Sequence, residues 1–141
     1  PSWWQDQYNR GLRVRVNPLM RGGALTTKDA TRIYLSPEAS LDRFGLPGTL
    51  AHEGQHVRQG AGWNTLVKGA QVLGATIAMR TGRAPGTTAN AFGKVVQEFL
   101  PNLAGGGYGG YSQAGGLGKG NYQTLANTTP LLRPLFSGFL K

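Results

Sequence analysis

The chain of 141 residues has no cysteine, only two histidines and only six acidic residues. The absence of cysteine excludes disulfide bonds and thiolate metal sites, and it leaves the redox compartment open. No apolar run reaches the roughly 18 residues that a membrane-spanning helix needs. No basic region followed by an apolar one opens the chain, so we expect no signal peptide. Because the first residue is Pro1 rather than methionine, we expect the C-terminal fragment of a longer protein.

Acidic residues are also outnumbered, 6 against 15 basic residues, which gives a net charge of +9. Such a surface either keeps a domain soluble or attracts a polyanion: nucleic acid, an anionic membrane or cell wall, or an acidic protein. The basic residues are scattered, and no zinc finger, RNA-recognition signature or basic helix is present, so nothing supports sequence-specific nucleic-acid binding. The length suits one domain, residues 1–141, with a single core.

The two histidines stand four residues apart in His52-Glu53-Gly54-Gln55-His56, an HExxH motif. On a helix, residues at this spacing lie one turn apart on the same face, so both imidazoles reach one Zn²⁺. The glutamate beside them can hold and deprotonate a metal-bound water. Because the chain has no other histidine, this spacing is rare by chance, and the motif predicts a zinc site.

A catalytic zinc ion normally takes three protein ligands and a water. No third histidine exists, and the only acidic residue after Glu53 is Glu98. A carboxylate beside apolar positions needs a partner, so we expect Glu98 to be the third ligand; a salt bridge to an arginine or lysine is the alternative. The upstream acids are weaker candidates, namely Asp29, Glu38 and Asp42, of which Asp42 could instead orient a ligand histidine.

The periodicity predicts an α+β fold in which a small antiparallel sheet packs on the HExxH helix, with further helices and a Gly-rich loop. Alternation and helical spacing predict elements at residues 12–16, 31–36, 47–59, 63–79 and 87–99. Pro101 is expected to end the last helix. The helix over 63–79 is apolar around much of its circumference, which is typical of the core, with a membrane-interacting segment as the alternative. We expect Trp3, Trp4 and Tyr8 to pack as an aromatic plug on the body of the domain, with an exposed binding patch as the alternative.

Two segments resemble a known family: residues 32–37, RIYLSP, and residues 50–59, LAHEGQHVRQ. They resemble the small zincin domains of contractile injection systems and bacterial polymorphic toxins, including the metallopeptidase tips of type VI secretion spike proteins. Two histidines with a glutamate from a later helix are similar to the gluzincin ligand set. The resemblance implies a toxin or effector that is secreted or injected into the cytoplasm or periplasm of a target cell. Its substrate would be a protein, a peptide or a peptidoglycan peptide, and its basic charge would suit an acidic immunity protein.

The predicted activity is that of a zinc metallopeptidase. His52, His56 and Glu98 would hold Zn²⁺, and Glu53 would take a proton from the bound water and pass it to the leaving amine. The oxyanion needs a second donor. Our candidates for this donor are Tyr108, Tyr111, Tyr122 or an arginine.

Two of those tyrosines lie in the segment 105–120, which holds nine glycines and is expected to be a loop beside the site or a linker.

Besides a zinc metallopeptidase, two other functions remain open. One is a non-catalytic zincin-like binding or delivery module with a structural metal, which the intact Glu53 disfavours. The other is a basic toxin acting on nucleic acid, which lacks any histidine outside the motif to serve as acid or base.

Overall fold

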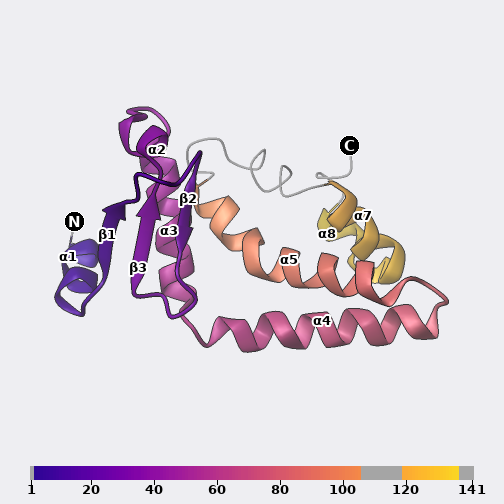
Figure 1. Cartoon of the computed structure of the whole chain (residues 1–141). Helices are drawn as coiled ribbons and strands as arrows, with labels where there is room; N and C mark the ends of the chain where they lie inside the picture. The colour runs from indigo at the N-terminus through magenta and orange to yellow at the C-terminus, as the bar shows by residue number, and fades with distance from the viewer. Residues whose placement is uncertain (1, 106–118, 137–141) are drawn as a thin grey trace.

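A small sheet and a long helical arm make up the protein in the computed structural model, which describes residues 2–105 and 119–136 (Figure 1). The fold is α+β, as predicted. In chain order the elements are α1 (Ser2–Asn9), β1 (Arg13–Val16), β2 (Ala24–Thr26), β3 (Arg32–Leu35), α2 (Pro37–Leu41), α3 (Leu46–Gln59), α4 (Trp63–Arg80), α5 (Pro85–Gly105), α7 (Lys119–Thr128), the 3-10 helix η2 (Pro130–Leu132) and α8 (Arg133–Phe136).

The sheet is mixed, so the prediction of an antiparallel sheet is wrong. Its strand order is β1-β3-β2, in which β1 pairs with β3 in parallel and β2 pairs with β3 antiparallel. The chain leaves β1, forms the unpredicted strand β2, and then enters β3 between the two earlier strands. Alternation of apolar residues identified β1 and β3 but carries no information on their relative direction.

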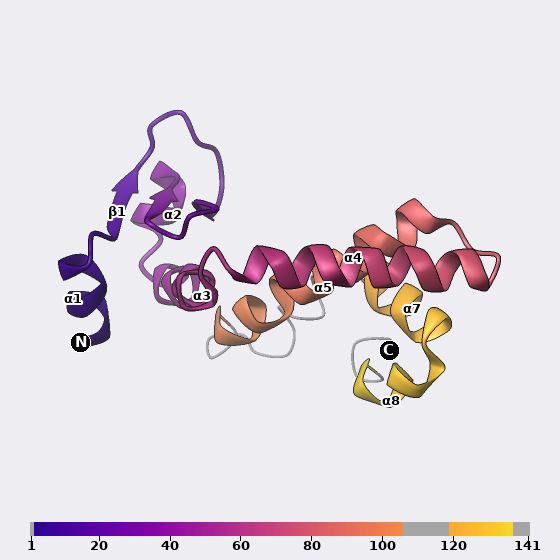
Figure 2. The same cartoon turned by 90° about the horizontal axis from the view of Figure 1, so that it is seen from below.

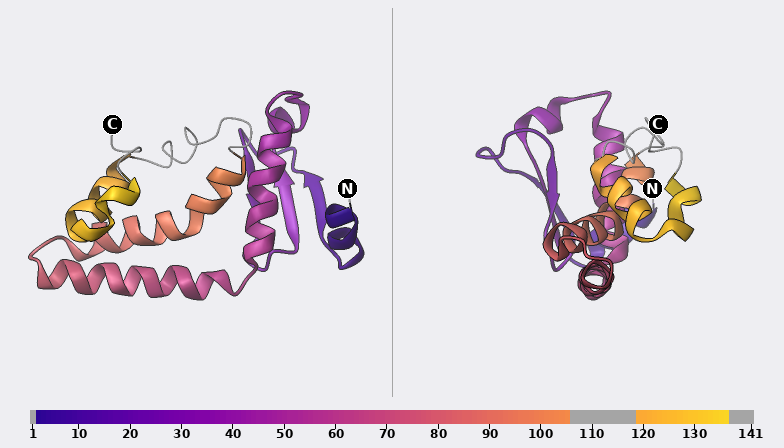
Figure 3. Two further views of the ribbon diagram at one scale, coloured as in Figure 1. Left: turned by 180° about the vertical axis from the view of Figure 1, so that it is seen from behind. Right: turned by 90° about the vertical axis from the view of Figure 1, so that its right-hand side faces the viewer.

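Helix α3 lies across one face of the sheet, which Figure 3 shows from behind. The alternation in β3 directs Ile33 and Leu35 to this face, where both are buried. Together with Leu12 they form a core that also takes in Leu50 and Val57 of α3. Burial of this one side of the helix leaves the HExxH side free for the site.

The N-terminal helix packs against α3 through its two tryptophans, as predicted, whereas the prediction that Tyr8 packs with them is wrong because Tyr8 is 55% exposed. The Trp4 ring lies 3.3 Å from the position that a Cβ on Gly54 would take, and the Trp3 ring lies 3.5 Å from it. The Arg58 guanidinium stacks 4.1 Å above the centre of the Trp3 ring. Glycine costs a helix about 1 kcal/mol relative to alanine, and the close approach of these rings explains why it is tolerated at position 54.

The arm is an antiparallel hairpin of α4 and α5, with α7 and α8 packed on its far part (Figure 1). Its core is a second cluster, formed by Ala91, Phe92, Val95, Tyr122, Leu125 and Phe136. None of the described helices is long and apolar enough to cross a membrane. Helix α5 continues through Pro101, so the prediction that this proline ends the helix is wrong. The proline ring is fully buried, and its packing offsets the missing backbone hydrogen bond.

Candidate metal centre

The motif lies on a helix, as predicted, and both ends of this helix are defined by local hydrogen bonds. Before α3, the Asp42 carboxylate accepts hydrogen bonds from the backbone N–H groups of Phe44 and Gly45. After it, Gly60 adopts a φ of +70° and donates its N–H to the His56 carbonyl. Asp42 thus stabilises the turn into α3, and the idea that it orients a ligand histidine finds no support in its contacts.

His52, His56 and Glu98 come together at one point between α3 and α5. One donor atom from each lies within 4.8 Å of the others, so the three side chains could hold one metal ion. Both histidine Nε2 atoms lie 3.2 Å from the same oxygen, Oε2 of Glu98. In a tetrahedral zinc site with bonds of about 2.0–2.1 Å, neighbouring ligand atoms are about 3.3 Å apart. The two histidine–glutamate distances therefore suit a shared metal ion, and the donor set is one that zinc accepts.

The three side chains are partly buried, and Glu98 and His52 each have a shifted pKa. Burial favours the neutral form of Glu98, but hydrogen bonds from His52 and His56 and the charges of these rings lower its pKa to about 2. Burial likewise opposes a charged His52, but its hydrogen bond to Glu98 and the charges of Glu53 and Glu98 raise its pKa above the usual 6.5. Glu98 is thus ionised above about pH 2 and can serve as an anionic ligand for a cation.

Helix packing near the site holds Glu98 in place. The indole N–H of Trp63, the first residue of α4, donates to the Val96 carbonyl at 2.9 Å. This bond joins the start of α4 to α5 two residues before Glu98. The turn that follows α3 is thereby fixed to the helix that supplies the third donor.

Glu53 is buried, with 6% of its surface exposed. Its carboxylate accepts a hydrogen bond from the Thr26 hydroxyl of β2, which also lies 3.3 Å from the Glu53 backbone oxygen. A buried carboxylate is costly unless it has such a donor. The edge strand of the sheet therefore holds the second residue of the HExxH motif.

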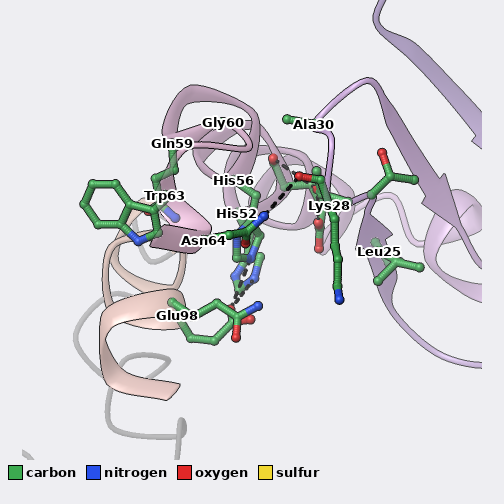
Figure 4. A pocket seen from close by; sticks show the side chains of 15 residues that line it. Leu25, Lys28, Ala30, His52, His56, Gln59, Gly60, Trp63, Asn64 and Glu98 are labelled. Atoms are coloured by element: carbon green, nitrogen blue, oxygen red, sulfur yellow. Dashed lines mark hydrogen bonds and ion pairs between the residues drawn. The ribbon is translucent and has the colours of Figure 1, made fainter. Parts of the chain in front are cut away.

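These residues share one pocket between the sheet edge and the arm (Figure 4). Its walls come from β2 and the following loop, the HExxH face of α3, the start of α4, and α5. The lining residues are Ala24, Leu25, Thr26, Thr27, Lys28, Ala30, His52, Glu53, His56, Gln59, Gly60, Trp63, Asn64, Gln97 and Glu98. Glu53 and the metal-ligand triad thus face the same space.

The predicted tyrosine donors do not join the site in the described part of the chain. Tyr122 is fully buried in the core of the arm, where its ring packs against Phe99 and Phe136, and it does not line the pocket. Tyr122 therefore lies outside the candidate metal centre. Tyr108 and Tyr111 lie outside the described residues.

Asp29 and Glu38, the other two weaker acidic candidates for the third ligand besides Asp42, are engaged elsewhere. The Asp29 carboxylate accepts hydrogen bonds from the hydroxyls of Thr27 and Thr31. Glu38 accepts a hydrogen bond from the Gly22 N–H and lies 3.9 Å from the Arg21 guanidinium. Of the acids considered, only Glu98 joins the two histidines.

Sequence reasoning missed the polar residues that surround the metal-ligand triad. Thr26, Trp63 and Asn64 all line the pocket, and the Asn64 amide donates to the Lys28 carbonyl at 3.4 Å. Trp63 and Asn64 directly follow the glycines that end the motif helix. This place in the sequence could have indicated that they lie close to the metal-ligand triad. No comparable signal marks Thr26.

No family model, curated protein or solved structure matches the chain. The resemblance to zincin toxin domains therefore stays a prediction.

Proposed function

We propose that the protein is a zinc-dependent metallopeptidase. The observation that carries the proposal is the placement of Glu53 in the same pocket as His52, His56 and Glu98. A purely structural metal site needs only ligands. A hydrolytic site also needs a base next to the metal, and the chain supplies one.

His52, His56 and Glu98 would hold the zinc ion, which would supply a bound water of lowered pKa and a Lewis acid for the scissile carbonyl. Glu53 would act as the base that accepts a proton from water and delivers it to the leaving amine. The Thr26 hydroxyl bonds the Glu53 carboxylate and fixes its direction. The fixed carboxylate does not need to reorient during proton transfer, which lowers the cost of the step.

The edge of β2 gives a peptide substrate a place to bind. The Thr27 N–H donates to the Arg32 carbonyl, and the Ser36 N–H donates to the Gly23 carbonyl. Because pairing alternates along an antiparallel ladder, the backbone groups of Ala24 and Thr26 point to the unpaired edge. An extended peptide can add to this edge and so run past Glu53. This supports a peptide bond as the target.

We further propose that the enzyme is a bacterial toxin or effector, secreted or injected into a target cell. The support is the resemblance of residues 32–37 and 50–59 to zincin toxin domains. The net charge of +9 favours an acidic immunity protein as its partner.

The variant Glu53→Gln distinguishes the proposed peptidase from a non-catalytic binding module and from a nuclease. This variant should retain about one zinc per chain and the wild-type circular dichroism, but lose nearly all cleavage of casein or peptides. Glu38→Gln, which changes an exposed carboxylate outside the pocket, is the matched control and should cleave normally. Wild-type protein that binds zinc but cleaves no peptide or peptidoglycan substrate would indicate a binding module. Cleavage of RNA or DNA that survives Glu53→Gln would indicate a nuclease.

A further inference from the structure

The outer side of α4 carries four exposed apolar residues. Its inner side packs on α5, where Gly74 and Ala78 are buried. Seen from below, α4 lies in front of α5 along the arm (Figure 2). On the outer side, Leu66, Val72, Leu73 and Met79 are each more than half exposed.

Helical geometry gathers these four side chains on one face. At about 100° per residue, Leu66 and Leu73 form one row, and Val72 and Met79 form a second row about 120° away. Gly69 and Thr76 lie between the two rows. We call these six residues the outer face of α4.

The outer face offers few polar groups to a partner. The Thr76 hydroxyl donates to the Val72 carbonyl at 2.8 Å, so it is satisfied within the helix. Lys68 and Arg80 are the charged residues on the exposed side of α4, and both are cations. From Gly54 to the end of the sequence the only acidic residue is Glu98, which lies in the metal centre. The exposed face is thus apolar with basic residues at its margins.

We infer that the outer face of α4 binds an anionic lipid surface. Its apolar side chains would enter the boundary between headgroups and acyl chains, while Lys68 and Arg80 would reach lipid phosphates. The helix would lie on the membrane, because its inner side stays packed on α5. Charge complementarity favours this partner over a second copy, since two chains of +9 repel each other.

Vesicle sedimentation tests the inference with the zinc-loaded protein. Wild type should bind vesicles of phosphatidylcholine with 30% phosphatidylglycerol at least tenfold better than vesicles of phosphatidylcholine alone. The double variant Val72→Gln, Leu73→Gln keeps the net charge and should bind the anionic vesicles at least fivefold less. Leu19→Gln, which changes an almost fully exposed leucine outside the arm, should bind like wild type.

Three results would overturn the inference. Equal binding by wild type and the double variant would show that charge alone attracts the protein. Absence of binding to anionic vesicles would exclude the lipid partner. A concentration-dependent dimer in light scattering, abolished by the double variant, would assign the face to a second copy. Thermal unfolding of the double variant near the wild-type midpoint would show that any loss of binding is not a loss of fold.

Discussion

Thr26 of the edge strand β2 holds Glu53 of the motif helix, because its hydroxyl donates to the Glu53 carboxylate. The interaction joins the strand that would carry substrate to the residue that would carry the proton. It also gives a buried carboxylate the donor that it requires.

Loss of the Thr26 hydroxyl should impair turnover without loss of metal. Thr26→Val keeps the shape of the side chain but removes the donor, and we expect kcat to fall about tenfold or more. Thr26→Ser keeps the hydroxyl and should restore most of the rate. Peptide cleavage and zinc content should be measured for both variants. Equal rates for valine and threonine at position 26, or loss of zinc in Thr26→Val, would refute the positioning role.

Glu98 should be required for tight zinc binding. The purified protein should contain about one zinc per chain, and Glu98→Ala should lose most of it, since two histidines alone leave the ion with too few ligands. Asp29 is not available to replace Glu98 as a ligand, because its carboxylate accepts hydrogen bonds from the hydroxyls of Thr27 and Thr31. Elemental analysis after dialysis measures the effect, with Glu38→Ala as the control. Full zinc in Glu98→Ala would mean that the third ligand is another group.

The three residues that could hold a metal ion were predictable from the sequence because the chain has so few alternatives. His52 and His56 are its only histidines, and Glu98 is the only acid that follows Glu53. Their contact across 42 residues was inferred from this scarcity and not from any geometric signal. The same reasoning could not select one tyrosine as the oxyanion donor, since several were available; of these, Tyr122 is buried in the core of the arm and does not line the pocket.

Strand β2 and its residue Thr26 could not be predicted, for a physical reason. The strand has three residues, Ala24–Thr26, which is too short to show an alternating pattern. It forms because β3 offers an edge to pair with, a tertiary effect that local sequence does not reveal. The extension of α5 past Pro101 has a similar origin, since burial of the proline ring is a property of the packed arm.

The metal-free protein should lose stability as the pH falls below about 4.5 and also as the pH rises above about 6.5. The lowered pKa of Glu98 means that its ionised form stabilises the fold above about pH 4.5, and that this stabilisation is lost as pH falls towards 2. The raised pKa of His52 means that its protonated form stabilises the fold below about pH 6.5, and that this stabilisation is lost as pH rises above that value.

Urea unfolding in the presence of a chelator, measured from about pH 3 to pH 8, tests this. The difference in unfolding free energy between wild type and Glu98→Gln should be largest between about pH 4.5 and 6.5. A difference that stays constant with pH would show that the His52–Glu98 pair does not titrate as described.

Two glycines of α4 should respond to alanine in opposite ways. A Cβ on Gly74 would lie 2.8 Å from Cγ of Phe92 and 3.0 Å from the Thr88 carbonyl oxygen, so α4 and α5 would have to separate. We expect Gly74→Ala to cost about 1–3 kcal/mol, even though alanine favours a helix. A Cβ on Gly69 meets nothing within 4 Å, so Gly69→Ala should stabilise by up to about 1 kcal/mol. Urea midpoints of the two variants measure the contrast. If Gly74→Ala were as stable as Gly69→Ala, the two helices would not pack as closely as described, and the outer face of α4 would have to be defined again.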